Sequence, residues 1–164
     1  MGGADPHAVG AKTRGVMSKP RGLTVLLIDH SVIIRRLLGQ LLAGDARIER
    51  VLEASDAAEG YSLFKVCRPD AVVLELELPD LHGLEILKRI KASGPSCALI
   101  VLTNTESKAA RAECLRRGAD SFLTKEAGLW TVANTIAELC RTASGEARRS
   151  RFGTQNGEES RERV

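Results

Sequence analysis

The 164-residue sequence contains few aromatic side chains, which make up only 3% of it. Proteins that bind single-stranded nucleic acid stack bases on aromatic rings, so this composition argues against such a surface. No apolar run approaches the length needed to cross a bilayer. The N-terminal region also lacks the apolar segment of a secretory signal. We therefore expect no membrane contact and one domain with a core of Leu, Ile, Val and Ala.

The cysteines form no C-x-x-C pair and lie far apart in the chain, as Cys67, Cys97, Cys114 and Cys140. Widely separated cysteines without a secretory signal argue against a zinc site and against a disulfide framework. We expect a cytoplasmic protein in which these side chains are small buried or half-buried hydrophobes.

Phosphate-binding glycine motifs are also missing, because neither G-x-G-x-x-G nor G-x-x-x-x-G-K-[ST] occurs. Nothing therefore supports a nucleotide-binding enzyme. Glu75 and Glu77 have the spacing of a phosphatase D-x-D motif, but strand alternation turns Glu77 toward the following loop. We expect a protein that is not an enzyme.

The net charge of +3 lies at the two ends of the chain. Residues 1–22 carry +3 and residues 143–164 carry +1, so residues 23–142 carry about −1. Neither end has an apolar periodicity, and we expect a disordered basic arm over 1–22 and a disordered Arg/Glu-rich tail over 143–164. The folded part is thus not basic, and nucleic acid is an unlikely partner.

Between these ends, five short apolar runs alternate with segments of helical periodicity. The predicted strands are 23–28, 48–54, 71–76, 97–102 and 121–124, and the predicted helices are 32–42, 56–66, 83–93, 106–117 and 129–141. A β-α order repeated five times predicts an α/β fold, with a parallel sheet covered by helices on both faces.

Polar residues follow most of the predicted strands, and they are Asp29, His30, Glu75, Thr103 and Lys125. The carboxyl ends of parallel strands share one edge of the sheet, which is where open α/β sheets bind their ligands. Carboxylates are ligands of Mg²⁺, and a lysine with a hydroxyl binds phosphate oxygens. This set therefore suits a divalent metal and a phosphoryl group.

Four motifs in this order resemble the receiver domain of two-component response regulators, the CheY-like family. They are LLIDHS, VVLELELPDLHG, VLTNT and GADSFLTK, and the resemblance covers about residues 23–142. It implies a flavodoxin-like (βα)5 three-layer sandwich with strand order 2-1-3-4-5. It also implies that Thr103 is the switch hydroxyl, Phe122 the aromatic that follows the switch, and Lys125 the phosphate-contacting lysine.

The resemblance fails at two pocket positions. Glu75 stands where the family has its phosphoacceptor Asp, four residues before Pro79. Asp29 matches the first acid of the Mg²⁺-binding pair, but His30 replaces the second. A further departure is Glu126, where the family usually has a proline after the lysine.

Both pocket changes point away from ordinary aspartyl phosphorylation. Glu75 adds one methylene, and a displacement of ~1 Å can cost on the order of a hundredfold in rate. An imidazole at His30 weakens a Mg²⁺ site that Asp29 and Glu75 would otherwise hold, because Mg²⁺ prefers oxygen. We expect an atypical single-domain receiver, or pseudo-receiver, in which Glu75 carries part of the charge of a phosphoaspartate.

Two alternatives stay open. One is a conventional receiver with Mg²⁺-dependent phosphotransfer, although the only nearby aspartate, Asp80, should point out of the pocket. The other is a metal-binding variant, in which Asp29, His30, Glu75 and His82 bind Zn²⁺, Mn²⁺ or Fe²⁺.

The resemblance also implies a partner surface, made by the fourth helix, fifth strand and fifth helix within residues 106–141. A sensor kinase, an adaptor, an output protein or a second copy of the chain is compatible with it. Trp130, the only tryptophan, is either an anchor on this surface or part of the core.

Overall fold

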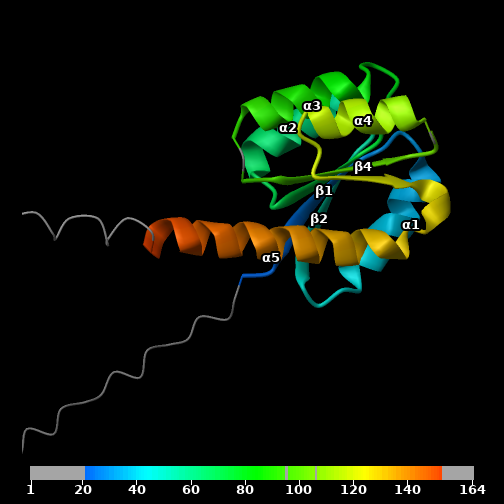
Figure 1. The fold of residues 1–164 in the computed structure, drawn as a ribbon. Helices are drawn as coiled ribbons and strands as arrows, with labels where there is room; N and C mark the ends of the chain where they lie inside the picture. Colours follow the sequence, from blue (N-terminus) through cyan, green and yellow to red (C-terminus); the bar gives the residue numbers. More distant parts are fainter. Residues whose placement is uncertain (1–20, 95, 106, 153–164) are drawn as a thin grey trace, which may run out of the picture.

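The chain folds around one parallel five-stranded sheet in a computed structural model that describes residues 21–94, 96–105 and 107–152 (Figure 1). The strands are β1 (Leu23–Ile28), β2 (Ile48–Ala54), β3 (Ala71–Leu74), β4 (Ala98–Thr103) and β5 (Ser121–Thr124). Their order across the sheet is β2-β1-β3-β4-β5. The structure thus confirms the predicted flavodoxin-like topology.

Five α-helices cover the two faces of the sheet: α1 (Val32–Ala43), α2 (Ala57–Cys67), α3 (Gly83–Ala92), α4 (Lys108–Arg116) and α5 (Trp130–Phe152). Figure 1 shows α2, α3 and α4 on one face and α1 with α5 on the other. A single 3-10 turn, η1 (Lys125–Ala127), follows β5. No helix among the described residues is both long enough and apolar enough to cross a membrane.

Strand alternation sends successive side chains into two separate cores. In β1, Leu26 and Ile28 pack under α2 and α3, whereas Val25 and Leu27 pack under α1 and α5. Strand β3 is buried at every position, as its uninterrupted Ala-Val-Val-Leu run predicts for a central parallel strand. The polar residues that follow β1, β3 and β4 are therefore held on a rigid support.

The third strand is shorter than the predicted 71–76 because the backbone turns away at Glu75. The Glu75 amide still donates to the Ile28 carbonyl of β1 at 2.9 Å. The next amide, that of Leu76, donates instead to the Glu75 carboxylate at 2.6 Å. The side chain of Glu75 thus ends its own strand.

The last helix is longer than predicted, since α5 continues to Phe152 and does not end at Arg141. The disordered tail expected from residue 143 is corrected accordingly over 143–152. Five of these ten residues are Ala or Arg, which favour helix even without an apolar face, and the docked turns before the stretch supply the nucleus. Residues 153–164 and 1–20 of the predicted tail and arm lie outside the described residues.

Candidate functional site

A buried charge cluster lies where β1, β3 and β5 end at the carboxyl edge of the sheet. The Lys125 ammonium is 2.7 Å from Asp29 Oδ2 and 2.6 Å from Glu75 Oε2. Glu75 is only 3% exposed, and the Lys125 side chain is 7% exposed. The fold therefore brings together three of the predicted site residues and shields them from water.

The second oxygen of each carboxylate is occupied by backbone amides of the following turn. Glu75 Oε1 accepts hydrogen bonds from Leu76 at 2.6 Å and from Glu77 at 3.2 Å. Asp29 Oδ1 accepts one from Ser31 at 2.8 Å. Both carboxylates are consequently fixed by the chain that follows them.

Thr103, the last residue of β4, completes the cluster from the neighbouring strand. Its side chain is buried, and its hydroxyl helps to lower the pKa of the Glu75 carboxyl. Two residues further on, the Thr105 hydroxyl donates to Glu77 Oε1 at 3.3 Å, while the Thr105 amide donates to Thr103 Oγ1 at 3.4 Å. The loops after β3 and β4 are thus joined by a contact that the sequence pattern did not reveal.

The contacts of Glu75 and Lys125 shift the pKa values of both groups. Burial raises the pKa of Glu75, but hydrogen bonds from Lys125, Thr103 and the Glu77 amide together outweigh it, so the pKa lies below its ordinary value of 4.5. Burial lowers the pKa of Lys125, and its bonds to Asp29 and Glu75 outweigh this effect in the same way, so that pKa is raised. At neutral pH, Glu75 is an anion and Lys125 a cation.

Phe122, the predicted switch aromatic, points into the molecule and is buried in the core beneath α3 and α4. Arg111 of α4 lies over its ring, with the guanidinium carbon 5.6 Å from the ring centre. The same guanidinium donates to the Phe122 carbonyl at 3.0 Å. Arg111 therefore attaches α4 to β5, a role that no sequence motif indicated.

Neither of the two candidate histidines joins the cluster. His30 is exposed at the end of β1, and His82 accepts a hydrogen bond from the Leu84 amide at 3.2 Å as the N-cap of α3. The described residues contain no group of three or more potential His, Cys, Asp or Glu ligands. The structure thus does not assemble the predicted set of Asp29, His30, Glu75 and His82.

Asp80 points out of the pocket, as the sequence predicted. Its carboxylate accepts hydrogen bonds from the Ala57 and Ala58 amides, each at 2.9 Å, at the N-terminus of α2. This contact ties the loop after β3 to a helix start, where an anion is favoured. Glu126, the other departure from the family pattern, is exposed in η1.

The remaining donors do not fit Mg²⁺. Asp29 and Glu75 are the only carboxylates of the cluster among the described residues, and both already bind the Lys125 ammonium. A small void of about 10 Å³ beside them is lined mainly by apolar core side chains and by Arg35, whose guanidinium donates to the Asp29 carbonyl at 2.5 Å. With Lys125 on both carboxylates and His30 exposed, the cluster offers Mg²⁺ no free pair of anionic ligands.

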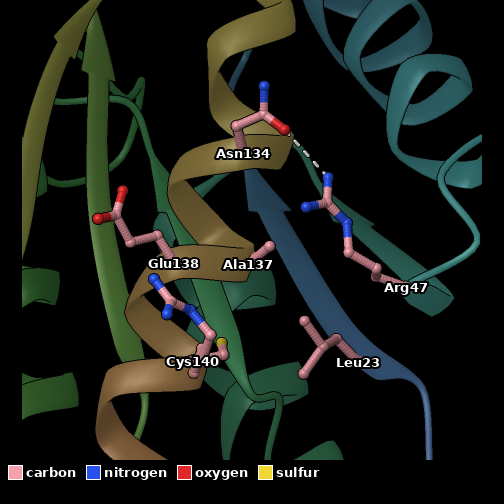
Figure 2. A pocket seen from close by; sticks show the side chains of 7 residues that line it. Leu23, Arg47, Asn134, Ala137, Glu138 and Cys140 are labelled. Atoms are coloured by element: carbon pink, nitrogen blue, oxygen red, sulfur yellow. Dashed lines mark hydrogen bonds between the residues drawn. The ribbon is translucent and has the colours of Figure 1, made fainter.

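A larger cavity of about 630 Å³ lies at the opposite, amino edge of the sheet, beside α5 (Figure 2). Its lining residues are Leu23, Arg47, Asn134, Ala137, Glu138, Cys140 and Arg141. Arg47 donates to Asn134 at 3.1 Å and forms an ion pair with Asp45 at 2.5 Å. None of the predicted site residues lines this cavity.

Comparison with known families identifies the same family that the four sequence motifs resemble. A model described as the response regulator receiver domain matches residues 25–137. The chain belongs to this family. The match includes Asp29, Glu75, Thr103 and Lys125, so the cluster occupies the region that the family shares.

Among curated relatives, this receiver domain is 34% identical over 125 residues to a nitrate/nitrite response regulator protein homolog of Haemophilus influenzae, covering 76% of the chain and 58% of the relative. It is 30% identical over 120 residues to a protein-glutamate methylesterase/protein-glutamine glutaminase of a Nocardioides species, covering 72% of the chain and 33% of the relative. The chain thus spans a third to somewhat over half of the length of these relatives.

Solved receiver structures show the same fold. A CheY-like receiver domain protein of Methanospirillum hungatei matches with a TM-score of 0.72 at 22% identity, covering 77% of this chain and 99% of that one. The response regulator domain of Thermotoga maritima CheB matches with a TM-score of 0.64 at 28% identity, covering 75% and 96%. The resemblance predicted from the four sequence motifs is therefore confirmed.

Proposed function

We propose that this receiver domain is atypical: it signals through protein contacts, and phosphotransfer at position 75 is weakened or lost. One observation carries the proposal. The Glu75 carboxylate itself receives the Lys125 ammonium and the Glu77 amide, and the Thr103 hydroxyl helps to lower its pKa. The resemblance to the family assigns the lysine and the hydroxyl to a phosphoryl group, so here a side chain of the protein takes their contacts.

These contacts also make Glu75 a poor nucleophile. One carboxylate oxygen binds Lys125 and the other binds two amides, so attack on phosphorus must break charge-assisted hydrogen bonds. The additional methylene of Glu75 displaces the attacking oxygen by roughly 1.5 Å relative to an aspartate. With His30 exposed, the pocket also lacks the second acid that the family uses for Mg²⁺.

We further propose that the chain has no catalytic activity of its own and acts in the cytoplasm on a sensor kinase, an adaptor or an output protein. The chain matches only about a third of the length of the protein-glutamate methylesterase relatives, so we do not assign their activity to this chain. The predicted partner surface within 106–141 carries two exposed large apolar side chains, Leu115 and Trp130. This surface remains a prediction, as does a homodimer.

The test is incubation of the protein with acetyl phosphate and Mg²⁺, read by intact mass. The wild type is compared with the Glu75→Asp/His30→Asp double variant, which restores both family residues. We expect no phosphoryl mass on the wild type and a clear phosphoryl mass on the variant. The reason is that the shorter side chain frees Thr103 and Lys125 for the phosphoryl group.

A Glu75→Asp/His30→Asp/Lys125→Ala variant serves as the control, because it keeps the new acceptor but removes the phosphate-contacting ammonium. It should incorporate much less phosphate than the double variant. If the wild type takes up phosphate as readily as the double variant, the chain is a conventional phospho-accepting receiver. If the wild type is modified at Asp80, the proposal is equally wrong.

A further inference from the structure

The cavity at the amino edge of the sheet lies between two well-supported walls (Figure 2). One wall is the start of β1 with the approach to β2, where the Leu23 amide donates to the Arg47 carbonyl at 2.9 Å. The other wall is α5, which Val132 and Ile136 anchor in the core. A volume of about 630 Å³ lies within the range of small-molecule sites. The cavity thus has the size of a ligand site, and the charge cluster at the carboxyl edge makes no use of it.

Arg47 is held in one orientation beside this cavity. Its Nε and Nη2 atoms donate to the two carboxylate oxygens of Asp45 at 2.8 and 2.5 Å. Nη2 also donates to Asn134 of α5 at 3.1 Å. The hydrogen bonds from Arg47 lower the pKa of Asp45 to about 2, so the pair is ionised at neutral pH. A guanidinium bound bidentately along one edge has a fixed direction, so the orientation of Arg47 exists before any ligand arrives.

The third nitrogen of this guanidinium, Nη1, faces the cavity. Asp45 takes the Nε and Nη2 edge, and Figure 2 shows the remaining nitrogen of Arg47 pointing toward α5, with no acceptor on it among the described residues. Arg141, a second cation of the lining, is exposed and forms no ion pair within the described part of the chain. Glu138 also lines the cavity, but in Figure 2 its carboxylate lies on the other side of α5 from Arg47. The polar part of the cavity therefore favours an anion.

The rest of the lining is apolar. Leu23 and Ala137 are both half-buried, so each presents part of its side chain to the cavity. Burial raises the pKa of the Cys140 thiol to about 11, so this side chain is neutral at physiological pH and adds a third apolar surface. An apolar lining with one oriented cation matches a ligand that has an apolar body and an anionic head group.

We propose that this cavity binds a small organic anion. The acidic head group of the ligand accepts hydrogen bonds from Arg47 Nη1, and its apolar body lies against Leu23, Ala137 and Cys140. A neutral molecule of the same shape binds less well, because it leaves Nη1 without an anionic acceptor. The inference does not depend on the phosphorylation state of position 75, since the cavity and the charge cluster lie at opposite edges of the sheet.

The probe is 1-anilinonaphthalene-8-sulfonate, which joins an apolar ring system to one negative charge. Its matched neutral compound is N-phenyl-1-naphthylamine, the same ring system without the sulfonate. The fluorescence of each compound is measured as the full chain is added. We expect the sulfonate to bind roughly tenfold more tightly than the neutral compound, because only the sulfonate offers anionic oxygens to Arg47.

Variants of both walls locate the site. Arg47→Gln should abolish the preference for the sulfonate, and Asp45→Asn/Arg47→Gln should do the same without leaving an unpaired aspartate. Ala137→Phe places a ring in the cavity and should weaken both compounds roughly tenfold. Arg89→Gln is the matched control, because Arg89 is an exposed arginine of α3, on the other face of the sheet. It should leave both affinities unchanged.

Circular dichroism checks that each variant is folded, and Arg47→Gln decides the test if Ala137→Phe unfolds the chain. Equal binding of the two compounds, no binding of the sulfonate, or an Arg47→Gln variant that keeps the preference would overturn the proposal. Loss of binding in Leu37→Gln would do so too, because the sulfonate would then lie on α1, where Leu37 is exposed. A wild-type dimer that Ala137→Phe converts to a monomer in sedimentation would show that a second copy occupies the cavity, with the same consequence.

Discussion

The two edges of the sheet use the same side-chain types for different purposes. At the amino edge, Asp70 and Asp120 precede β3 and β5 and accept hydrogen bonds from amides near the start of neighbouring strands, from Thr24 at 2.8 Å and Leu99 at 2.7 Å. Both side chains remain about a third exposed. At the carboxyl edge, Asp29 and Glu75 follow their strands and are almost fully buried.

Each edge also has a lysine, and the difference lies in what surrounds it. Lys91 binds Asp120 at 2.6 Å and the Cys97 carbonyl at 3.1 Å, and its partner Asp120 is partly exposed. Lys125 is buried between two carboxylates and is the only cation that contacts both among the described residues. At the amino edge, an aspartate side chain thus accepts a hydrogen bond from the backbone amide of a neighbouring strand. At the carboxyl edge, the carboxylates instead form buried ion pairs with Lys125.

The largest expected effect comes from removing the buried lysine. Lys125→Met leaves Asp29 and Glu75 buried without a counterion, and we expect a loss of about 3–5 kcal/mol in the free energy of unfolding. Lys91→Met at the amino edge should cost about 1 kcal/mol, because Asp120 can turn to water. Urea denaturation of both variants measures the difference.

Neutralising the carboxylates should rescue the first variant. Lys125→Met combined with Asp29→Asn and Glu75→Gln removes the uncompensated charges and should recover most of the lost stability. Equal losses for Lys125→Met and Lys91→Met would show that the two edges are alike, contrary to the comparison.

A smaller effect is expected from Glu75→Gln, and it should depend on pH. At pH 7, the variant should be less stable than the wild type by about 2 kcal/mol, because Lys125 loses a charged hydrogen-bond partner. The folded-state pKa of Glu75 lies below 4.5, so its contribution is complete above pH 4.5 and is lost as the pH falls through the folded-state value. The wild-type advantage should therefore shrink in acid.

The informative quantity is the difference in stability between the wild type and Glu75→Gln. The pKa values of Asp45, Asp80 and Glu113 are also lowered, so these groups make the stability of both proteins depend on pH. Thermal unfolding at a series of pH values from 7 downward supplies this difference. Asp120→Asn is the matched change at the amino edge and should cost about 1 kcal/mol or less. A wild-type advantage that grows in acid would contradict the assigned charge of Glu75.

The third expected effect concerns Gly83, where the loop after β3 closes against the strand end. A Cβ at this position would lie 2.5 Å from the Glu75 carbonyl oxygen and 2.6 Å from Leu76 Cα. Gly83→Ala should therefore displace the loop and cost about 1–3 kcal/mol. Gly44→Ala, where the nearest atom is 3.5 Å away, should change stability by less than ~1 kcal/mol in either direction.

The midpoints of urea denaturation measure the stability losses of the two glycine variants. A Gly83→Ala variant as stable as Gly44→Ala would show that the carboxyl edge is as tolerant of displacement as the surface near α1.

Much of this architecture could be predicted from the sequence because its signals are local. Apolar runs and helical periodicity gave five strands and five helices, and the four motifs gave the strand order. The position of Glu75 at a strand end followed from the run of buried residues before it. Its closeness to Asp29 and Lys125 could be predicted because parallel strands end at a common edge of the sheet.

Other features depend on contacts between distant segments, which periodicity does not contain. Helix α1 has seven large apolar residues, and only the packed structure shows that Ile33, Leu37 and Leu41 are exposed. The Asp80 carboxylate accepts hydrogen bonds from the Ala57 and Ala58 amides of α2, which are 23 and 22 residues away in the sequence. Arg111 over Phe122 and Thr105 on Glu77 likewise need the fold to bring them together.

Glu75 occupies the pocket as an anion at neutral pH, and its own titration tests this most directly. The carboxyl carbon of Glu75 can be followed by carbon-13 NMR as the pH is lowered, and the Glu75→Gln variant identifies its signal. We predict a midpoint below 4.5, because hydrogen bonds from Lys125, Thr103 and Glu77 outweigh burial. A midpoint at or above 4.5 would show that burial dominates, and would contradict the account.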